Sequence, residues 1–183
     1  MLHLKNDSVY DRKMAHDNLL QSRDLAYGMN LILHDCRVSK KYIELDTSVP
    51  QAFLEELIKK LSTIAPLDHA KHVIEETFEK GHAISQGRSY FNDGRFWECH
   101  EVLEGGWKQI DGDEKKLVNG LILVAAGLVH YQKDEDDTCI SIFNRALEKL
   151  QNANGMYHSI DVDRVKSLVL EMIKTKQIST FEI

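Results

Sequence analysis

Proline and cysteine are scarce in this chain. It has two prolines among 183 residues, which leaves little room for a long linker. The three cysteines, Cys36, Cys99 and Cys139, lie far apart and form no CxxC pair, which excludes a disulfide framework and a zinc knuckle. Scattered thiols fit a reducing compartment, so we expect a cytoplasmic protein in which each cysteine is a small buried hydrophobe.

Long apolar runs and an excess of positive charge are also missing. The most apolar run, residues 117–129, is interrupted by Asn119 and two glycines and is too short to span a bilayer. The first residues lack the apolar core of a signal peptide. The formal net charge is −6, which argues against binding nucleic acid by general phosphate neutralisation. We therefore expect neither a membrane nor a nucleic acid as partner.

What is present is the composition of an ordinary globular protein, with 43% hydrophobic and 28% charged residues. Residues 1–75 predict a small α+β unit. A polar helix is expected from about Val9 to Tyr27, where Gly28 ends it. Alternating apolar residues then predict a β-hairpin, with strands near 29–33 and 42–45. Its basic loop contains Arg37, Lys40 and Lys41; we interpret it as a solvated hairpin tip, the alternative being a phosphate or RNA contact.

A helix should follow the hairpin. Ser48-Val49-Pro50-Gln51 has the spacing of a capping box with a proline in the first turn. The apolar residues between 53 and 61 recur at helical spacing. The segment 72–74 is interpreted as a third strand, with the start of the next helix as the alternative.

Residues 76–183 predict an all-helical domain. Turn signals such as Asn92-Asp93-Gly94 separate the apolar periodic segments. The expected helices cover about 77–91, 95–109, 114–133, 137–150 and a last segment that starts near 161. The fold class is therefore mainly α: an antiparallel helical array of about five helices with two hairpins, preceded by the small α+β unit.

The two hairpins are related by a shift of about 40 residues, a period typical of helix-pair arrays. The shift aligns Gly87 with Gly127, Tyr90 with His130, Cys99 with Cys139, Leu103 with Phe143, and Gly106 with Ala146. The match is either a helical hairpin repeat or a coincidence between two amphipathic helix pairs. Both interpretations predict two antiparallel hairpins packed together.

The segment that could carry chemistry begins with FWECHEVLE at residues 96–104. At about 100° per residue, His100 falls on the same arc as Phe96, Leu103 and Trp107, so we expect a buried imidazole. A buried imidazole needs a hydrogen-bond partner, and Glu104, one turn further on, can supply it.

His130 is the expected third member of this site, because antiparallel packing can bring it alongside. His100, Glu104 and His130 could then bind a divalent metal such as zinc, or act as acid and base in a hydrolytic site. The pocket would be lined by Trp97, Glu101 and Trp107. The pattern is H-E-x-x-E, which lacks the second histidine of the zincin motif and excludes that type of metalloprotease.

A rival interpretation remains open for the same residues. His100, Glu104 and His130 could form a structural polar network that locks helices together. The domain would then be a non-catalytic interaction or scaffold module, with a protein partner or a second copy as its ligand.

The helical signature also resembles a known family. The pattern is Phe91-Asn92-x-Gly94-x-Phe96-Trp97-Glu98-x-His100-Glu101-x-Leu103-Glu104-x-x-Trp107, followed by Gly120-Leu121-Ile122-x-x-Ala125-Ala126-x-x-x-His130. It is similar to domain-of-unknown-function family number 309, over roughly residues 77–152. Residues 37–46 resemble an extension found in archaeal members, so the chain is identified as an archaeal-type member with an N-terminal extension.

The resemblance implies a small helical array and no established function. It points to the same site positions: Trp97, His100, Glu101, Glu104, Trp107 and His130. The chain departs from the signature at Gly105-Gly106, which should loosen the end of that helix.

Overall fold

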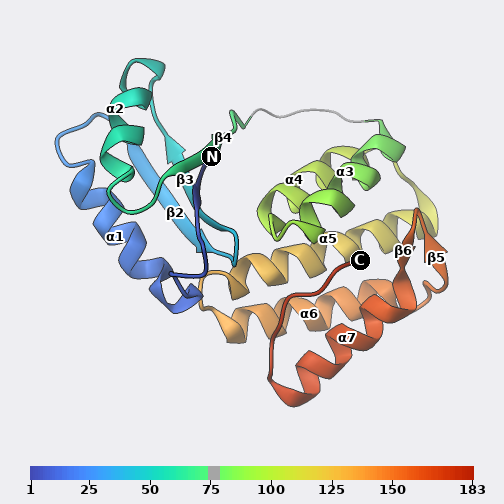
Figure 1. The fold of residues 1–183 in the computed structure, drawn as a ribbon. Helices are drawn as coiled ribbons and strands as arrows, with labels where there is room; N and C mark the ends of the chain where they lie inside the picture. Colours follow the sequence, from blue (N-terminus) through green and yellow to red (C-terminus); the bar gives the residue numbers. More distant parts are fainter. Residues whose placement is uncertain (74–78) are drawn as a thin grey trace. The chain divides into compact units, whose positions relative to one another are not determined.

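A four-stranded antiparallel sheet forms the first of two units in the computed structural model, which describes residues 1–73 and 79–183 (Figure 1). The first unit comprises Met1–Ile74 with Gln132–Asp134, and the second comprises Glu75–Tyr131 with Glu135–Ile183. The expected boundary at residue 75 falls outside the described residues.

The sheet has the order β2-β3-β1-β4. Its strands are β1 (Leu2–Lys5), β2 (Ile32–Val38), β3 (Tyr42–Ser48) and β4 (Leu67–Ala70). The predicted hairpin is β2–β3, but β2 begins later than expected because turn hydrogen bonds hold the chain from Ala26 to Leu31. His72 and Val73, expected in a strand, have no regular structure, and Ile74 lies outside the described residues.

The helices of this unit are α1 (Ala15–Leu25) and α2 (Gln51–Leu61), and a short 3-10 helix, η1 (Arg12–Met14), precedes α1. The sequence predicted α2 correctly, but not its cap. Pro50 occupies the N-cap position without a side-chain hydrogen bond. Ser48 ends β3 instead, and its hydroxyl lies 2.7 Å from Nε2 of His34 on β2.

Arg37 corrects the interpretation of the hairpin tip. Its side chain is 2% exposed and its Nε lies 3.2 Å from a carboxylate oxygen of Glu44, which is 1% exposed. Lys40 and Lys41 are exposed. Arg37 is therefore a buried residue of β2 and not part of a solvated loop, because its side chain lies on the same sheet face as its cross-strand partner Glu44 and pairs with it.

The second unit is built from helices, which confirms the mainly α class. They are α3 (Lys80–Asn92), α4 (Phe96–Trp107), α5 (Gly112–Tyr131), α6 (Asp136–Leu150) and α7 (Val162–Thr175). The expected count of about five helices and two hairpins is not matched exactly: the described residues of the whole chain hold seven α-helices and an unpredicted β-hairpin, β5 (Met156–Tyr157) with β6 (Ile160–Asp161). Residues 77 and 78, the expected start of α3, lie outside the described residues.

The helix pairs α3–α4 and α5–α6 have matching close contacts at the 40-residue shift. A Cβ atom added to Gly87 would lie 2.7 Å from a methyl carbon of Leu103. At the shifted positions, a Cβ atom on Gly127 would lie 2.6 Å from the ring of Phe143. In both pairs a glycine thus allows a large apolar residue of the second helix to pack against the backbone of the first.

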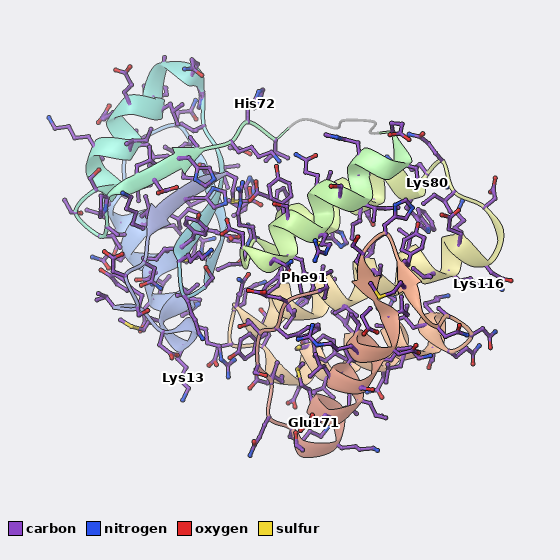
Figure 2. All side chains as sticks on the ribbon, turned by 45° about the vertical axis from the view of Figure 1, so that its right-hand side comes forward. Lys13, His72, Lys80, Phe91, Lys116 and Glu171 are labelled. Carbon is purple, nitrogen blue, oxygen red and sulfur yellow. The ribbon has the colours of Figure 1, made fainter. Side chains whose placement is uncertain are left out.

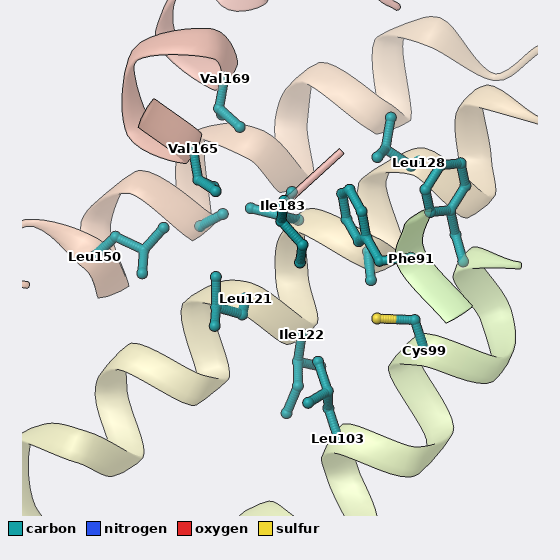
Figure 3. Packing of buried hydrophobic residues seen from close by; sticks show 14 of the residues in the cluster. Phe91, Cys99, Leu103, Leu121, Ile122, Leu128, Leu150, Val165, Val169 and Ile183 are labelled. Atoms are coloured by element: carbon teal, nitrogen blue, oxygen red, sulfur yellow. The ribbon is translucent and has the colours of Figure 1, made fainter. Parts of the chain in front are cut away.

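One core cluster links these helices. It includes Phe91 and Leu103 from the first pair, Leu121 and Leu128 from α5, and Val165 from α7 (Figure 3).

Charged side chains such as those of Lys13, Lys116 and Glu171 are exposed (Figure 2). Within the described parts of the chain, no helix has the length and apolar character to cross a membrane.

Candidate functional site

Helix α4 carries the predicted site residues, and it buries a different face from the one expected. It begins after a tight turn in which Gly94 has a φ of 75°. Its buried residues are Phe96, Glu98, Cys99, Val102, Leu103, Gly105 and Gly106. At about 100° per residue, the centre of this face lies near Cys99 and Gly106, with His100 outside it.

His100 is therefore half-buried, with 26% of its side chain exposed. The expectation of a fully buried imidazole was wrong because it gave the tryptophans more weight than the small residues. Small residues allow helices to approach closely, so they mark the contact face as well as large apolar residues do.

The structure brings three potential ligands together on the exposed side of α4. Nε2 of His100 lies 3.6 Å from a carboxylate oxygen of Glu104 and 3.9 Å from one of Glu101. One donor atom from each residue lies within 4.8 Å of the other two. The carboxylates keep 51% and 46% of their side-chain exposure. These distances exceed those of strong hydrogen bonds, so the three groups adjoin without a tight bond between them.

The second ring nitrogen of His100 faces the protein interior. Nδ1 is buried and has no hydrogen-bond partner among the described residues. Because Nε2 faces two carboxylates, the proton of the neutral ring is better placed on Nε2. A cation bound at Nε2 would require that proton on Nδ1, and a buried N–H without an acceptor costs about 1–3 kcal/mol. This arrangement permits cation binding and limits its strength.

His130, the third ligand expected from the sequence, lies elsewhere. It is in the last turn of α5, where its Nδ1 pairs with a carboxylate oxygen of Glu135. Among the described residues, the metal-type cluster consists of His100, Glu101 and Glu104 and does not include His130. Glu101, expected only as a pocket residue, thus takes the position that the sequence suggested for His130.

Both tryptophans of α4 are half-buried. The indole Nε1 of Trp107 donates to the backbone oxygen of Lys115 at 3.0 Å, and the Lys115 ammonium lies 4.7 Å from the centre of the ring. Gly105 and Gly106 are buried, and a Cβ atom on Gly106 would lie 2.5 Å from that of Ala83. Gly106 therefore permits a close approach of α3 and α4. The expectation that the glycine pair loosens the end of the helix stays a prediction.

The segment that carries the signature of α4 and α5 matches a known family model. Residues 84–142 match the family model described as Domain of unknown function (DUF309). This matched segment of the second unit is called the DUF309 domain below. This domain includes every site residue predicted from the sequence, and the resemblance inferred from the sequence is confirmed.

The chain is also similar to a curated relative named "Uncharacterized protein" from Aquifex aeolicus (strain VF5). The two are 24% identical over 148 residues, which cover 77% of this chain and 44% of the relative. The chain thus spans less than half the length of this relative. An archaeal-type origin and an N-terminal extension of the DUF309 domain stay predictions.

One polar pair in the DUF309 domain was not predicted. Glu98 is 1% exposed, and both of its carboxylate oxygens lie 2.5 Å from guanidinium nitrogens of Arg95. The guanidinium carbon of Arg95 lies 4.5 Å from the centre of the Tyr90 ring. Burial works against the charge on Arg95, but the bonds to Glu98 prevail and raise the pKa of the guanidinium. The R-x-x-E spacing was the available signal, because residues three apart are neighbours on a helix.

Proposed function

We propose that the DUF309 domain binds a divalent cation, of which zinc is the best match, through His100, Glu101 and Glu104. The observation that supports this most is the cluster of one imidazole and two carboxylate donors on a single exposed helix face. Imidazole and carboxylate are both common ligands of zinc.

The distances fit a site that closes slightly around an ion. Zinc–ligand bonds of about 2.0–2.2 Å in tetrahedral geometry place neighbouring donors roughly 3.4 Å apart. The imidazole already lies 3.6 Å from Glu104 and 3.9 Å from Glu101. The two carboxylates are exposed, so small side-chain rotations suffice to close these distances and the helix backbone need not move.

Three protein ligands leave a fourth position for water, as in catalytic zinc sites. When bound, zinc would supply a water molecule of lowered pKa. The site would then be hydrolytic, with His100 holding its proton on Nδ1, and Glu101 and Glu104 fixing the ion through their exposed carboxylates. Because Nδ1 has no acceptor among the residues that the structure describes, we expect a dissociation constant in the micromolar range or weaker, and not the tight binding of a structural zinc site.

Isothermal titration of the metal-free protein with zinc chloride tests the proposal. The wild type should bind one zinc ion per chain, and His100→Ala or Glu104→Gln should lower the affinity by at least about tenfold. His130→Ala is the matched control, because His130 pairs with Glu135 outside the cluster. An unchanged titration in His100→Ala, or a loss confined to His130→Ala, would refute the site as placed here.

The second candidate function is a non-catalytic protein-interaction module. Trp97 favours it, because this half-buried tryptophan lies on the same side of α4 as the exposed carboxylates of Glu101 and Glu104. Tryptophan is among the residues that contribute most to protein interfaces. If this face binds a second copy, sedimentation equilibrium should show association that Trp97→Ala weakens at least tenfold while zinc binding stays unchanged.

A further inference from the structure

A serine and a histidine of the first unit are hydrogen-bonded to each other at the surface. Ser48 is the last residue of β3, and its Oγ lies 2.7 Å from Nε2 of His34 on β2. The two strands are neighbours in the sheet (Figure 1). Both residues are exposed, so a small molecule can reach them. A hydroxyl bonded to an imidazole is the arrangement of a serine nucleophile and its general base.

An irregularity in β2 places the imidazole there. The register of β2 against β3 shifts between Leu33 and Asp35, so His34 has no cross-strand partner in this pairing. A bulge of this kind re-aims a side chain relative to the regular alternation, and bulges are over-represented next to active sites. His34 is exposed and takes no part in the apolar core of the unit. Its contact with Ser48 is therefore not a by-product of core packing.

The direction of the hydrogen bond decides whether the pair can react. The hydroxyl of Ser48 donates to Nε2 when the neutral ring of His34 carries its proton on Nδ1. Asp35, the adjacent carboxylate, accepts instead from the backbone N–H of Cys36 and pairs with Lys133 at 3.2 Å. Among the residues that the structure describes, none bonds Nδ1 of His34. The pair is thus a dyad without the orienting acid of a triad, which predicts a modest rate.

Ser48 opens onto a pocket of about 870 Å³, a size typical of small-molecule sites. Part of the lining is apolar and comes from the half-buried residues Leu31, Val49 and Leu54. The ionisable residues of the lining carry both signs of charge: Asp46, Lys71 and His72. A neutral, partly apolar molecule therefore suits the pocket better than a strongly charged one.

The first turn of α2 borders the same pocket. Pro50, at the N-cap, and Gln51 line it, and Pro50 makes no side-chain capping bond. The first N–H groups of a helix have no acceptor within the helix and carry a partial positive charge. Such groups stabilise the oxyanion that forms when a serine attacks an ester. The nucleophile and the potential oxyanion donors therefore border one cavity.

We propose that Ser48 and His34 form an active site, separate from the zinc site, that hydrolyses small neutral carboxylic esters through an acyl-serine intermediate. Oγ of Ser48 forms a bond to the carbonyl carbon while its proton passes to Nε2 of His34. The bond to the alcohol then breaks, and the imidazolium gives its proton to the departing alcohol. A water molecule next attacks the acyl group, its proton passes through Nε2 to Oγ, and the carboxylic acid is released.

Labelling with a fluorophosphonate tests the nucleophile, because this probe forms a covalent bond with activated serines. The full chain is treated with fluorophosphonate–rhodamine, and the labelled residue is identified by mass spectrometry. We expect the label on Ser48, at a rate that falls about a hundredfold in His34→Gln through loss of the general base. Ser62→Ala is the matched control and should label as the wild type does, because this exposed serine bonds the backbone oxygen of Ile58 and no histidine. Absence of a label, a label on another residue, or an unchanged rate in His34→Gln would overturn the dyad.

Turnover of an ester separates this site from the proposed zinc site. In stopped-flow hydrolysis of p-nitrophenyl acetate, the wild type should release a burst of about one p-nitrophenol per chain as the acyl-serine forms. The burst should disappear in Ser48→Ala and stay unchanged with EDTA, because neither residue of the dyad belongs to the cluster at His100. His16→Gln, at an exposed histidine of α1, controls for reaction with surface imidazoles and should keep the burst. A missing burst, a burst that persists in Ser48→Ala, or one that EDTA removes would overturn the proposal.

Discussion

The close approach of α3 and α4 makes Gly106→Ala a demanding test of the packing that supports the candidate site. An added Cβ atom would lie 2.5 Å from Cβ of Ala83. Carbon atoms in contact are normally about 3.5–4.0 Å apart, so the two helices would have to separate by roughly 1 Å. Neither atom can rotate away, because both are attached directly to a helix backbone.

The expected cost follows from two opposing effects. Overpacking a tight core contact costs about 1–3 kcal/mol, and the upper end applies here because both atoms are fixed. Replacing glycine in a helix by alanine stabilises the helix by about 1 kcal/mol, because alanine has the higher helix propensity. We expect Gly106→Ala to lower the free energy of unfolding by about 2 kcal/mol, with Ala83→Gly in the same chain recovering most of the overpacking.

Urea unfolding followed by tryptophan fluorescence reports on the second unit of the fold, because both tryptophans of the chain, Trp97 and Trp107, are on α4. Ala83→Gly alone gives the remaining corner of the double-mutant cycle. The reasoning is wrong if Gly106→Ala is neutral or stabilising, or if the effects of the two substitutions simply add.

Three further predictions concern charge and burial. Burial opposes ionisation of Glu114, but hydrogen bonds from Tyr157 and Lys80 outweigh it and lower the pKa of the carboxyl below 4.5. The ionised carboxylate therefore stabilises the folded protein fully above pH 4.5, and this stabilisation is lost as the pH falls through the lowered pKa. Glu114→Gln should flatten the dependence of the unfolding midpoint on pH in that range. Arg37→Met leaves the buried carboxylate of Glu44 without this partner and should reduce the free energy of unfolding by about 3 kcal/mol in urea titrations; a change below 0.5 kcal/mol would contradict the importance of the pair. The three cysteines are buried, so a thiol-reactive chromophore should label none in the native protein and all three in urea, and rapid native labelling would show that the core opens.

The sequence predicted the elements that have a long, regular pattern. The helix at α2 and the apolar central helix α5 follow from spacing alone, since periodicity over several turns is a strong signal. Strands β1 and β4 were missed because each has four residues, too few for an alternation to stand out. They are strands because they pair with neighbours that are distant in the chain, a tertiary effect that local preference does not contain.

The candidate site could be predicted only in part. The i,i+4 relation of His100 and Glu104 is a local property of a helix, so the sequence was sufficient to place them together. The partner of His130 depends on the turn after α5, because that turn brings a carboxylate oxygen of Glu135 to Nδ1 of His130. The burial of Glu98 depends on which face of α4 contacts its neighbours, and the sequence analysis centred that face on the arc of Phe96, His100 and Trp107, whereas the buried face is centred near Cys99 and Gly106.

The zinc content of the purified protein tests the central claim most directly. The protein, prepared without a histidine tag, is incubated with zinc, passed through a desalting column and analysed by inductively coupled plasma mass spectrometry beside His100→Ala. The account predicts close to one zinc ion per chain in the wild type and a large loss in the variant. Zinc that is absent from a folded wild type, or that persists in His100→Ala, would contradict it.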